Sequence, residues 1–283
     1  MLRTPTARVL DERDEDAVHR LLATDPVAAC VLAGRVEAAG AAQASLGAPL
    51  WGMGRDGELD AVCLAGTNLI PFCRPGAERD AAVAFAERAR RGGRRCSTIV
   101  GSALAVEPLW QLLAPHWGPA RDHRPSQPLM AISAAPRVAS EPHVRRVEPA
   151  ELDLLFPAAV AMFTEEVGVS PLRTDGGAGY RARVAELVGA GHSLAWFDQG
   201  RVVFKAEIGA VSRAACQVQG VWVAPGHRGR GIGTAGTAAV VDYARAAIAP
   251  VVSLYVNDFN GPARAAYQRV GFREVGRFAS VLF

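Results

Sequence analysis

The chain has 283 residues, enough for a substantial buried core and about two domains of ~100–200 residues each. Hydrophobic residues make up 50% of it and charged residues 21%, a composition that excludes an intrinsically disordered chain. The 31 Lys and Arg residues against 28 Asp and Glu leave a net charge of +3, too small for a protein specialised in binding nucleic acid or a membrane surface.

The cysteines indicate a reducing environment. They are odd in number and scattered, which excludes a fully paired disulfide framework and a tight zinc cluster, so no metal is expected: Cys30, Cys63, Cys73, Cys96 and Cys216. Four acidic residues stand where a signal peptide would need a basic and then an apolar segment: Asp11, Glu12, Asp14 and Glu15. No apolar run reaches membrane-spanning length. We therefore expect a cytoplasmic protein.

The chain divides at a Pro- and Ser-rich stretch, residues 134–142, which predicts an N-terminal domain at 1–138 and a C-terminal domain at 139–283. Hydrophobic periodicity and turn residues predict the elements of the first half. In chain order these are a helix at 15–22, a longer helix after Pro26, a hairpin turn at Asp56-Gly57, a strand at 59–66, a helix at 77–91, a strand at 97–100 and a helix near 106–113.

The second half has a similar rhythm of helix, hairpin and helix, which suggests a degenerate duplication. Its predicted elements are a strand at 144–147, helices at 149–166 and 179–190, hairpin strands at 193–197 and 202–209, a strand at 217–223, a glycine loop, a helix at 234–246, a strand at 251–256 and a helix near 263–270.

The glycine loop between the strand at 217–223 and the following helix is the sharpest local signal. Glycines there let backbone N–H groups point outward beside a helix N-terminus, which makes a cradle for phosphate. A P-loop is excluded because the loop has no lysine; Lys205 is the only lysine of the chain. Gly231, Gly233 and Gly236 match a dinucleotide fingerprint, with Asp258 near the position of a ribose-binding acid. However, too few residues follow Asp258 to build the remaining parallel strands.

A third interpretation fits the whole C-terminal region. Arg228, Gly231 and Gly233 match the coenzyme-A loop of the GNAT-type N-acetyltransferase superfamily, which has the form [R/Q]-x-x-G-x-[G/A]. The signature N-x-x-A-x-x-x-Y-x-x-x-G-F follows in register, at Asn260, Ala263, Tyr267, Gly271 and Phe272. Residues 144–283 therefore resemble this superfamily.

The resemblance implies a mixed α/β (α+β) fold, a mostly antiparallel sheet with flanking helices, in tandem with a truncated, cofactor-free GNAT-like N-terminal domain. It implies acetyl-CoA as co-substrate, held where the strands at 217–223 and 251–256 separate. The pantetheine arm would pair with the backbone of Val221, Trp222 and Val223. The implied pyrophosphate-binding residues are Arg228, Gly229, Arg230, Gly231, Ile232, Gly233 and Thr234, and Asn260 would orient the cofactor or cap the last helix.

The resemblance assigns Tyr267 as the general acid that protonates the departing thiolate, a transfer suited to a phenol. Some relatives place a glutamate on the strand that leads to the loop, where this chain has Gln217 and Gln219. Glu207 is the substitute that we predict as base; the alternative is a surface pair with Lys205, on the same strand face. No base is needed if the amine arrives deprotonated.

The acceptor has no local sequence code. A small-molecule amine or a protein amine is expected, and neither nucleic acid nor a membrane. The first half would wall the acceptor site. Two alternatives stay open: an acetyl-CoA-binding sensor without turnover, and a two-domain acetyltransferase like mycothiol synthase.

Overall fold

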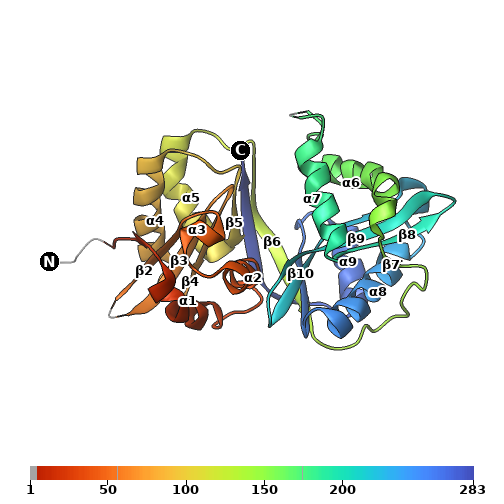
Figure 1. Cartoon of the computed structure of the whole chain (residues 1–283), viewed down its shortest axis with the longest axis horizontal. Coiled ribbons are helices and arrows are strands. Elements are labelled where there is room, and N and C mark those ends of the chain that lie inside the picture. The colour runs from red at the N-terminus through yellow and green to blue at the C-terminus, as the bar shows by residue number, and fades with distance from the viewer. Residues whose placement is uncertain (1–4, 56, 174) are drawn as a thin grey trace. The chain divides into compact units, whose positions relative to one another are not determined.

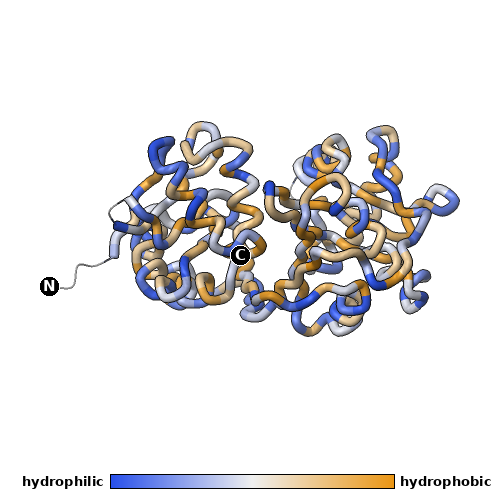
Figure 2. Tube along the Cα trace, turned by 90° about the horizontal axis from the view of Figure 1, so that it is seen from below, coloured by the Kyte–Doolittle hydropathy of each residue, from blue (hydrophilic) through white to orange (hydrophobic). Residues whose placement is uncertain are grey.

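The computed structural model describes residues 5–55, 57–173 and 175–283. By its internal contacts the chain divides into two units. Unit 1 comprises residues 1–129, 255–259 and 274–283, and unit 2 comprises residues 130–254 and 260–273. The predicted domain boundary between residues 138 and 139 stays a prediction. In both units hydrophobic stretches of the trace alternate with hydrophilic turns (Figure 2). No helix among the described residues has the length and hydrophobicity to cross a membrane.

The first half of the chain contributes six strands and five α-helices among the described residues (Figure 1). They are β1 (Arg8–Val9), α1 (Glu15–Leu22), α2 (Cys30–Ala39), α3 (Gln43–Leu46), β2 (Leu50–Arg55), β3 (Glu58–Ala65), β4 (Asn68–Cys73), α4 (Glu78–Gly92), β5 (Thr98–Ser102), α5 (Ala103–Trp117) and β6 (Asp122–Ile132).

The second half repeats this order of strands and helices, with α3 as the only α-helix that has no counterpart among the described residues. Its elements are β7 (Arg145–Arg146), α6 (Leu152–Val167), α7 (Ala178–Gly189), β8 (Ser193–Asp198), β9 (Arg201–Val211), β10 (Ala215–Val223), α8 (Ile232–Ala247), β11 (Val251–Tyr255), α9 (Gly261–Val270) and β12 (Arg273–Leu282). The mixed α/β architecture with a mostly antiparallel sheet is therefore confirmed.

Four strands are absent from the sequence-based prediction: β1, β4, β6 and β12. β6 contains Pro125 and Pro128, and proline lacks the N–H that a strand interior donates. Helix α5 is longer than predicted because it continues through Pro108 and Pro115. The predicted hairpin between β2 and β3 is present, with Arg55 paired to Glu58. Asp56 of its turn lies outside the described residues.

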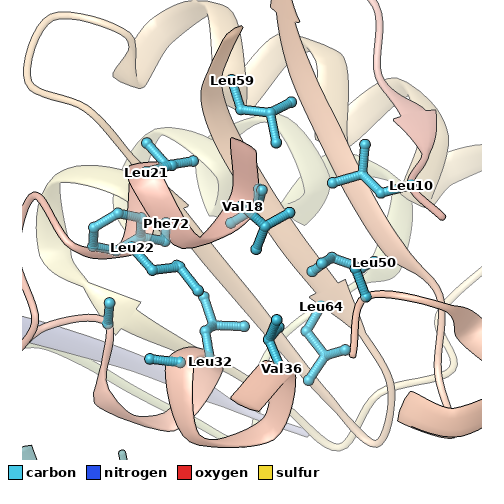
Figure 3. Close-up of a cluster of buried hydrophobic side chains, with 14 of the residues drawn as sticks. Leu10, Val18, Leu21, Leu22, Leu32, Val36, Leu50, Leu59, Leu64 and Phe72 are labelled. Carbon is cyan, nitrogen blue, oxygen red and sulfur yellow. The ribbon is translucent and has the colours of Figure 1, made fainter. Parts of the chain in front are cut away.

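Unit 1 has strands on which both faces are buried. In β3, Val62 and Leu64 point into one hydrophobic cluster, while Ala61 and Cys63 point into another on the opposite face. Figure 3 shows the first cluster, in which side chains from α1 and α2 lie over the strands. Burying leucine and valine side chains in this way contributes about 1.5–3 kcal/mol each.

The last strand of the chain, β12, completes unit 1. Its residues Phe278–Leu282 pair antiparallel with Ser102–Thr98 of β5. The strand order in this unit is β1-β2-β3-β4-β5-β12-β6. Ala279 and Val281 are fully buried in the same cluster as Ile99 and Leu109. The C-terminal strand, blue in Figure 1, is therefore part of the N-terminal unit's core.

In unit 2 the strand order is β11-β10-β9-β8-β7. Neighbouring side chains of β9 point to opposite faces: Phe204 lies against α8, while Lys205 lies on the face covered by α6. The pairs β8–β9 and β9–β10 are antiparallel, and β10–β11 is parallel. This parallel pair positions the candidate site.

Candidate functional site

Strands β10 and β11 pair only at their beginnings. The register joins Ala215–Gln217 to Val251–Ser253, although β10 continues to Val223 and β11 to Tyr255. Backbone groups of Val221, Trp222 and Val223 therefore lie beyond this parallel pairing. The sequence interpretation expected these two strands to separate here, and the register agrees with it.

A β-bulge lies in β10 next to the point where the pairing with β11 stops. Gln219 is opposite Glu207 and Trp222 is opposite Lys205, so β10 has one residue more than β9 between these pairs. Gly220 occupies the bulge with φ +60°. Its conformation favours glycine, and a Cβ at this position would lie 3.0 Å from Met162 Cε and 3.1 Å from Lys205 Nζ, so both side chains would have to shift slightly.

Beneath the bulge lies a buried ion pair. Lys205 Nζ is 2.7 Å from Glu207 Oε1, and the side chains are 0% and 6% exposed. Lys205 Nζ also donates a hydrogen bond of 3.0 Å to the carbonyl oxygen of Gly220. The pairing of Glu207 with Lys205 was one of the two predicted alternatives for Glu207, but its surface location was wrong: α6 covers this face of β9.

The glycine loop leads from β10 to α8. After a short 3₁₀ turn at Pro225–His227, Gly229 has φ +77° and Gly231 has φ +82°. No atom lies within 4 Å of an added Cβ at either glycine, so conformation alone requires them. The N–H groups of residues 229–233 donate no hydrogen bond to another described residue. They are therefore available to an anion, as is usual at a helix N-terminus.

Helix α8 begins at the predicted loop. Its first residues, Ile232, Gly233 and Thr234, are partly exposed, and its first turn contains no acidic residue. Gly236 has a different role, because a Cβ there would lie 2.7 Å from the ring of Phe204. This third glycine allows α8 to pack closely on β9.

A side-chain triad that the sequence did not predict joins α6 to this region. Glu165 accepts hydrogen bonds from Trp222 Nε1 at 3.1 Å and from Arg228 Nη2 at 2.7 Å. Arg228 Nε donates to the carbonyl oxygen of Val223 at 2.9 Å. The Arg228 side chain is therefore held along β10, while its loop neighbour Arg230 is exposed and forms no ion pair with another described residue.

Helix α9 carries the remaining two candidates and packs against α8. Asn260 is its N-cap: the side-chain oxygen accepts a hydrogen bond from Ala263 N at 3.2 Å, which confirms the capping interpretation. Tyr267 is 8% exposed. Burial, and secondarily the charge of Glu166, raises the pKa of Tyr267 above its usual range, so the phenol keeps its proton at neutral pH.

The structure thus places most of the predicted residues along one path, from the end of β10 through the loop into α8, with α9 beside it. Glu207 lies apart from this path, under the bulge. Glu165 and Gly220 were missed. The interactions of Glu165 span 57 and 63 residues of sequence and leave no local pattern, whereas Gly220 could have been recognised as a glycine inside a strand, a usual sign of a bulge.

Among the described residues, no three His, Cys, Asp or Glu side chains form a group that could hold a metal ion. No curated protein matches the sequence significantly. Two family models do match. Residues 48–155 match a domain of unknown function, DUF4081, and residues 160–272 match the acetyltransferase (GNAT) family.

Several solved structures resemble the chain over nearly its whole length. A GNAT-family acetyltransferase from Colwellia psychrerythraea is 11% identical with a TM-score of 0.56, covering 98% of this chain and 99% of its own. A Drosophila protein is 12% identical with a TM-score of 0.66, over 99% of both chains. A GCN5-related N-acetyltransferase from Sphaerobacter thermophilus is 19% identical with a TM-score of 0.55, over 99% of this chain and 95% of its own.

These TM-scores show a shared fold over both halves of the chain. Together with the family match, they agree with the motifs at Arg228–Gly233 and Asn260–Phe272. Residues 160–272 are therefore similar to the GNAT acetyltransferase family, and they follow a region, residues 48–155, that is similar to DUF4081.

Proposed function

We propose that the chain is an acetyl-CoA-dependent N-acetyltransferase, in which the C-terminal half transfers an acetyl group to an amine by direct attack within a ternary complex. The observation that carries the proposal is the end of β10–β11 pairing after Gln217, which leaves residues 218–223 of β10 unpaired with β11 just before a loop with unpaired N–H groups. The end of β10 that is unpaired with β11 would bind an extended thioester arm, and the N–H groups of the loop that follows would bind a pyrophosphate.

The loop suits a pyrophosphate on three grounds. Gly229 and Gly231 leave open space where side chains would stand. The N-terminus of α8 adds a partial positive charge. Arg230 and His227 add basic side chains at the loop, and α8 has no acid in its first turn. Acetyl-CoA supplies an activated acyl group; the chain's residues would bind and orient it.

In the reaction the amine nitrogen bonds to the thioester carbonyl carbon, the carbon–sulfur bond breaks, and the amine loses one proton. The backbone N–H groups near Trp222 and Val223 would donate to the developing oxyanion. Tyr267 would protonate the thiolate, and its raised pKa keeps the proton in place until the sulfur departs. The phenolate then regains a proton from solvent.

The proton of the amine has two possible routes. Glu207 acting through water is one, and an amine that arrives deprotonated is the other. The ion pair of Glu207 with Lys205 favours the second route, because this carboxylate is already in contact with an ammonium under the bulge. A small-molecule or protein amine is the acceptor that we propose, with the N-terminal half as scaffold.

A sensor that binds acetyl-CoA without turnover is the second candidate. The observation that favours it is the lack of any carboxylate in β10, where Gln217 is buried and Gln219 is exposed. Retention of Tyr267 on α9 favours the enzyme.

The test combines binding and turnover with the full chain. Isothermal calorimetry should detect acetyl-CoA binding, and NAD(H) should bind weakly or not at all. Thioester consumption with a panel of primary amines, followed by mass spectrometry, should then identify an acetylated product. Absence of acetyl-CoA binding would contradict the proposal. Binding without product over a broad panel would favour the sensor.

A further inference from the structure

The chain's single lysine is one of its most deeply buried side chains. Lys205 is 0% exposed and Glu207 is 4% exposed, in the interior of unit 2. Removing two opposite charges from water costs more than their attraction usually returns, and a hydrophobic pair of similar volume is often as stable or more so. A buried pair therefore calls for an explanation other than stability.

The surroundings of the pair supply that explanation. Lys205 and Glu207 are the β9 residues opposite Trp222 and Gln219, so they flank the bulge on the partner strand. Lys205 Nζ donates to the carbonyl oxygen of Gly220 at 3.0 Å. The Lys205 ammonium therefore contacts both the Glu207 carboxylate, at 2.7 Å, and the Gly220 carbonyl oxygen, at 3.0 Å.

Each part of this arrangement supports the others. The Glu207 carboxylate positions the Lys205 ammonium under the bulge. The ammonium in turn donates to the Gly220 carbonyl oxygen, and this hydrogen bond stabilises the left-handed backbone of Gly220 at φ +60°. Glycine adopts this conformation without strain but can adopt many others, so the hydrogen bond to its carbonyl oxygen selects one of them. The first residues beyond it, Val221–Val223, are those that would meet the thioester arm.

We propose that Lys205 and Glu207 form a positioning pair that fixes the Gly220 bulge and thereby sets the backbone of Val221–Val223 for binding the thioester. This inference rests on the proposed function for its ligand, but the effect on the bulge can be measured without one. It gives Glu207 a role through Lys205 rather than as a base.

The main test replaces both charges by apolar side chains in the full chain, Lys205→Met with Glu207→Leu. The free energy of unfolding in urea should stay the same or rise, because no unpaired charge is left. Amide hydrogen exchange in a peptide covering residues 219–223 should become at least about tenfold faster, since protection falls with the local opening free energy. Acetyl-CoA affinity should fall about tenfold, which corresponds to 1.4 kcal/mol.

Ser212→Ala is the matched control. It removes another buried hydrogen-bonding side chain from the β9–β10 hairpin, at the Ala215 turn and away from the bulge. It should leave exchange at residues 219–223 and acetyl-CoA affinity unchanged. Unchanged exchange and unchanged affinity in the double variant would overturn the inference. If the wild type binds no acetyl-CoA, the proposed function fails while the exchange result still decides the role of the pair.

Two further variants keep the test decisive. Should the double variant not fold, Gly220→Ala disturbs the bulge directly and should cause the same loss of affinity; retained affinity would overturn the inference.

Glu207→Gln separates positioning from base catalysis. A loss of turnover that is constant between about pH 7 and 9 supports positioning, whereas a loss that shrinks as pH rises would identify a base, because a base matters less once the amine is neutral.

Discussion

The loop after β4 in the first half and the loop after β10 in the second half occupy the same place in the order of elements. Both follow a strand whose parallel pairing stops early: Asn68–Leu69 with β5, and Ala215–Gln217 with β11. The two loops differ in length. Residues 74–77 connect β4 to α4, whereas residues 224–231 connect β10 to α8.

The chemistry at the two helix starts differs more than the backbone does. In the first half, Glu78 begins α4 and its carboxylate accepts a hydrogen bond from Gly76 N at 3.0 Å. Asp80 adds a second negative charge in the same turn. In the second half α8 begins with Ile232, and no acid stands in its first turn. An anion would thus be repelled at α4 and attracted at α8.

The strands that lead to these loops differ as well. β4 pairs with β3 without a register shift, and the facing residues of β3, such as Ala61 and Cys63, are apolar. β10 has its bulge over the charged pair of β9. The early end of parallel pairing occurs in both halves and therefore belongs to the fold. The β10 bulge, the longer loop after β10 and the absence of an acid in the first turn of α8 occur only at the candidate binding site.

The largest expected effect concerns a side chain that the first half lacks. Tyr267 is the seventh residue of α9, and the seventh residue of α5 is the buried Leu109. Tyr267→Phe should lower turnover ~10²–10⁴-fold, the usual effect of removing a general acid, and leave acetyl-CoA affinity unchanged. Steady-state kinetics and calorimetry measure the two. Tyr243→Phe, which removes a hydroxyl bonded to the Gly191 carbonyl, is the control.

The pH dependence of turnover checks the same residue. An acid acts only while protonated, and the pKa of Tyr267 is raised above its ordinary 10.0. Its contribution should therefore persist through pH 10 and be lost only as pH rises through the higher value. A rate that falls with an apparent pKa below 9, in a protein still folded by circular dichroism, would assign the acid elsewhere.

The next effect tests the two loops directly. Gly231→Val places a side chain in the open space of the cradle and in a left-handed conformation, and should weaken acetyl-CoA binding at least about tenfold. Gly76→Val is matched to it, because Gly76 also has a positive φ, +89°, and open space around its Cβ. That variant should lose similar stability and keep full affinity. Equal losses of affinity would mean that strain, and not contact with the ligand, explains both.

A smaller effect follows from giving α8 the charge found in α4. Ile232→Glu puts a carboxylate in the first helical turn, and repulsion of about 1 kcal/mol should weaken acetyl-CoA binding several-fold. Higher salt should reduce the difference from wild type, since exposed charges are screened. Ile232→Gln is the uncharged control. A salt-independent loss would indicate a steric cause.

The smallest effect is expected in the first half. Glu78→Gln removes the negative charge from the start of α4 and should lower the free energy of unfolding by about 0.3–1 kcal/mol. In a Gly231→Val background it should restore no acetyl-CoA binding, because the short loop and the regular β4 remain. Recovery of binding would show that the charge alone had kept the first half from binding the ligand.

Local features were predicted well from the sequence. Helix α1 is found at the predicted residues 15–22, where its four buried residues recur with helical spacing. The glycine loop was predicted from its pattern between a strand and a helix, and Gly229 and Gly231 have the positive φ values that such a local turn favours. The cap at Asn260 is equally local, since its acceptor and donor are three residues apart.

Features that depend on distant pairing were not predicted. Phe278–Leu282 of β12 are buried on both faces and therefore show no alternation, and their partner β5 lies far back in the sequence. The pair of Lys205 with Glu207 followed from their spacing of two, but its burial depends on α6, which lies elsewhere in the chain. Glu165 was missed for the same reason.

The position of β12 also bears on how the protein comes to be folded during synthesis. Between Ser102, where β5 ends, and Arg273, where β12 begins, lies almost all of unit 2. While the ribosome makes those residues, β5 has one edge without its strand, and such an edge can pair with other chains. The unit whose chain emerges first therefore receives its strand β12 only after nearly all of the other unit has been synthesised.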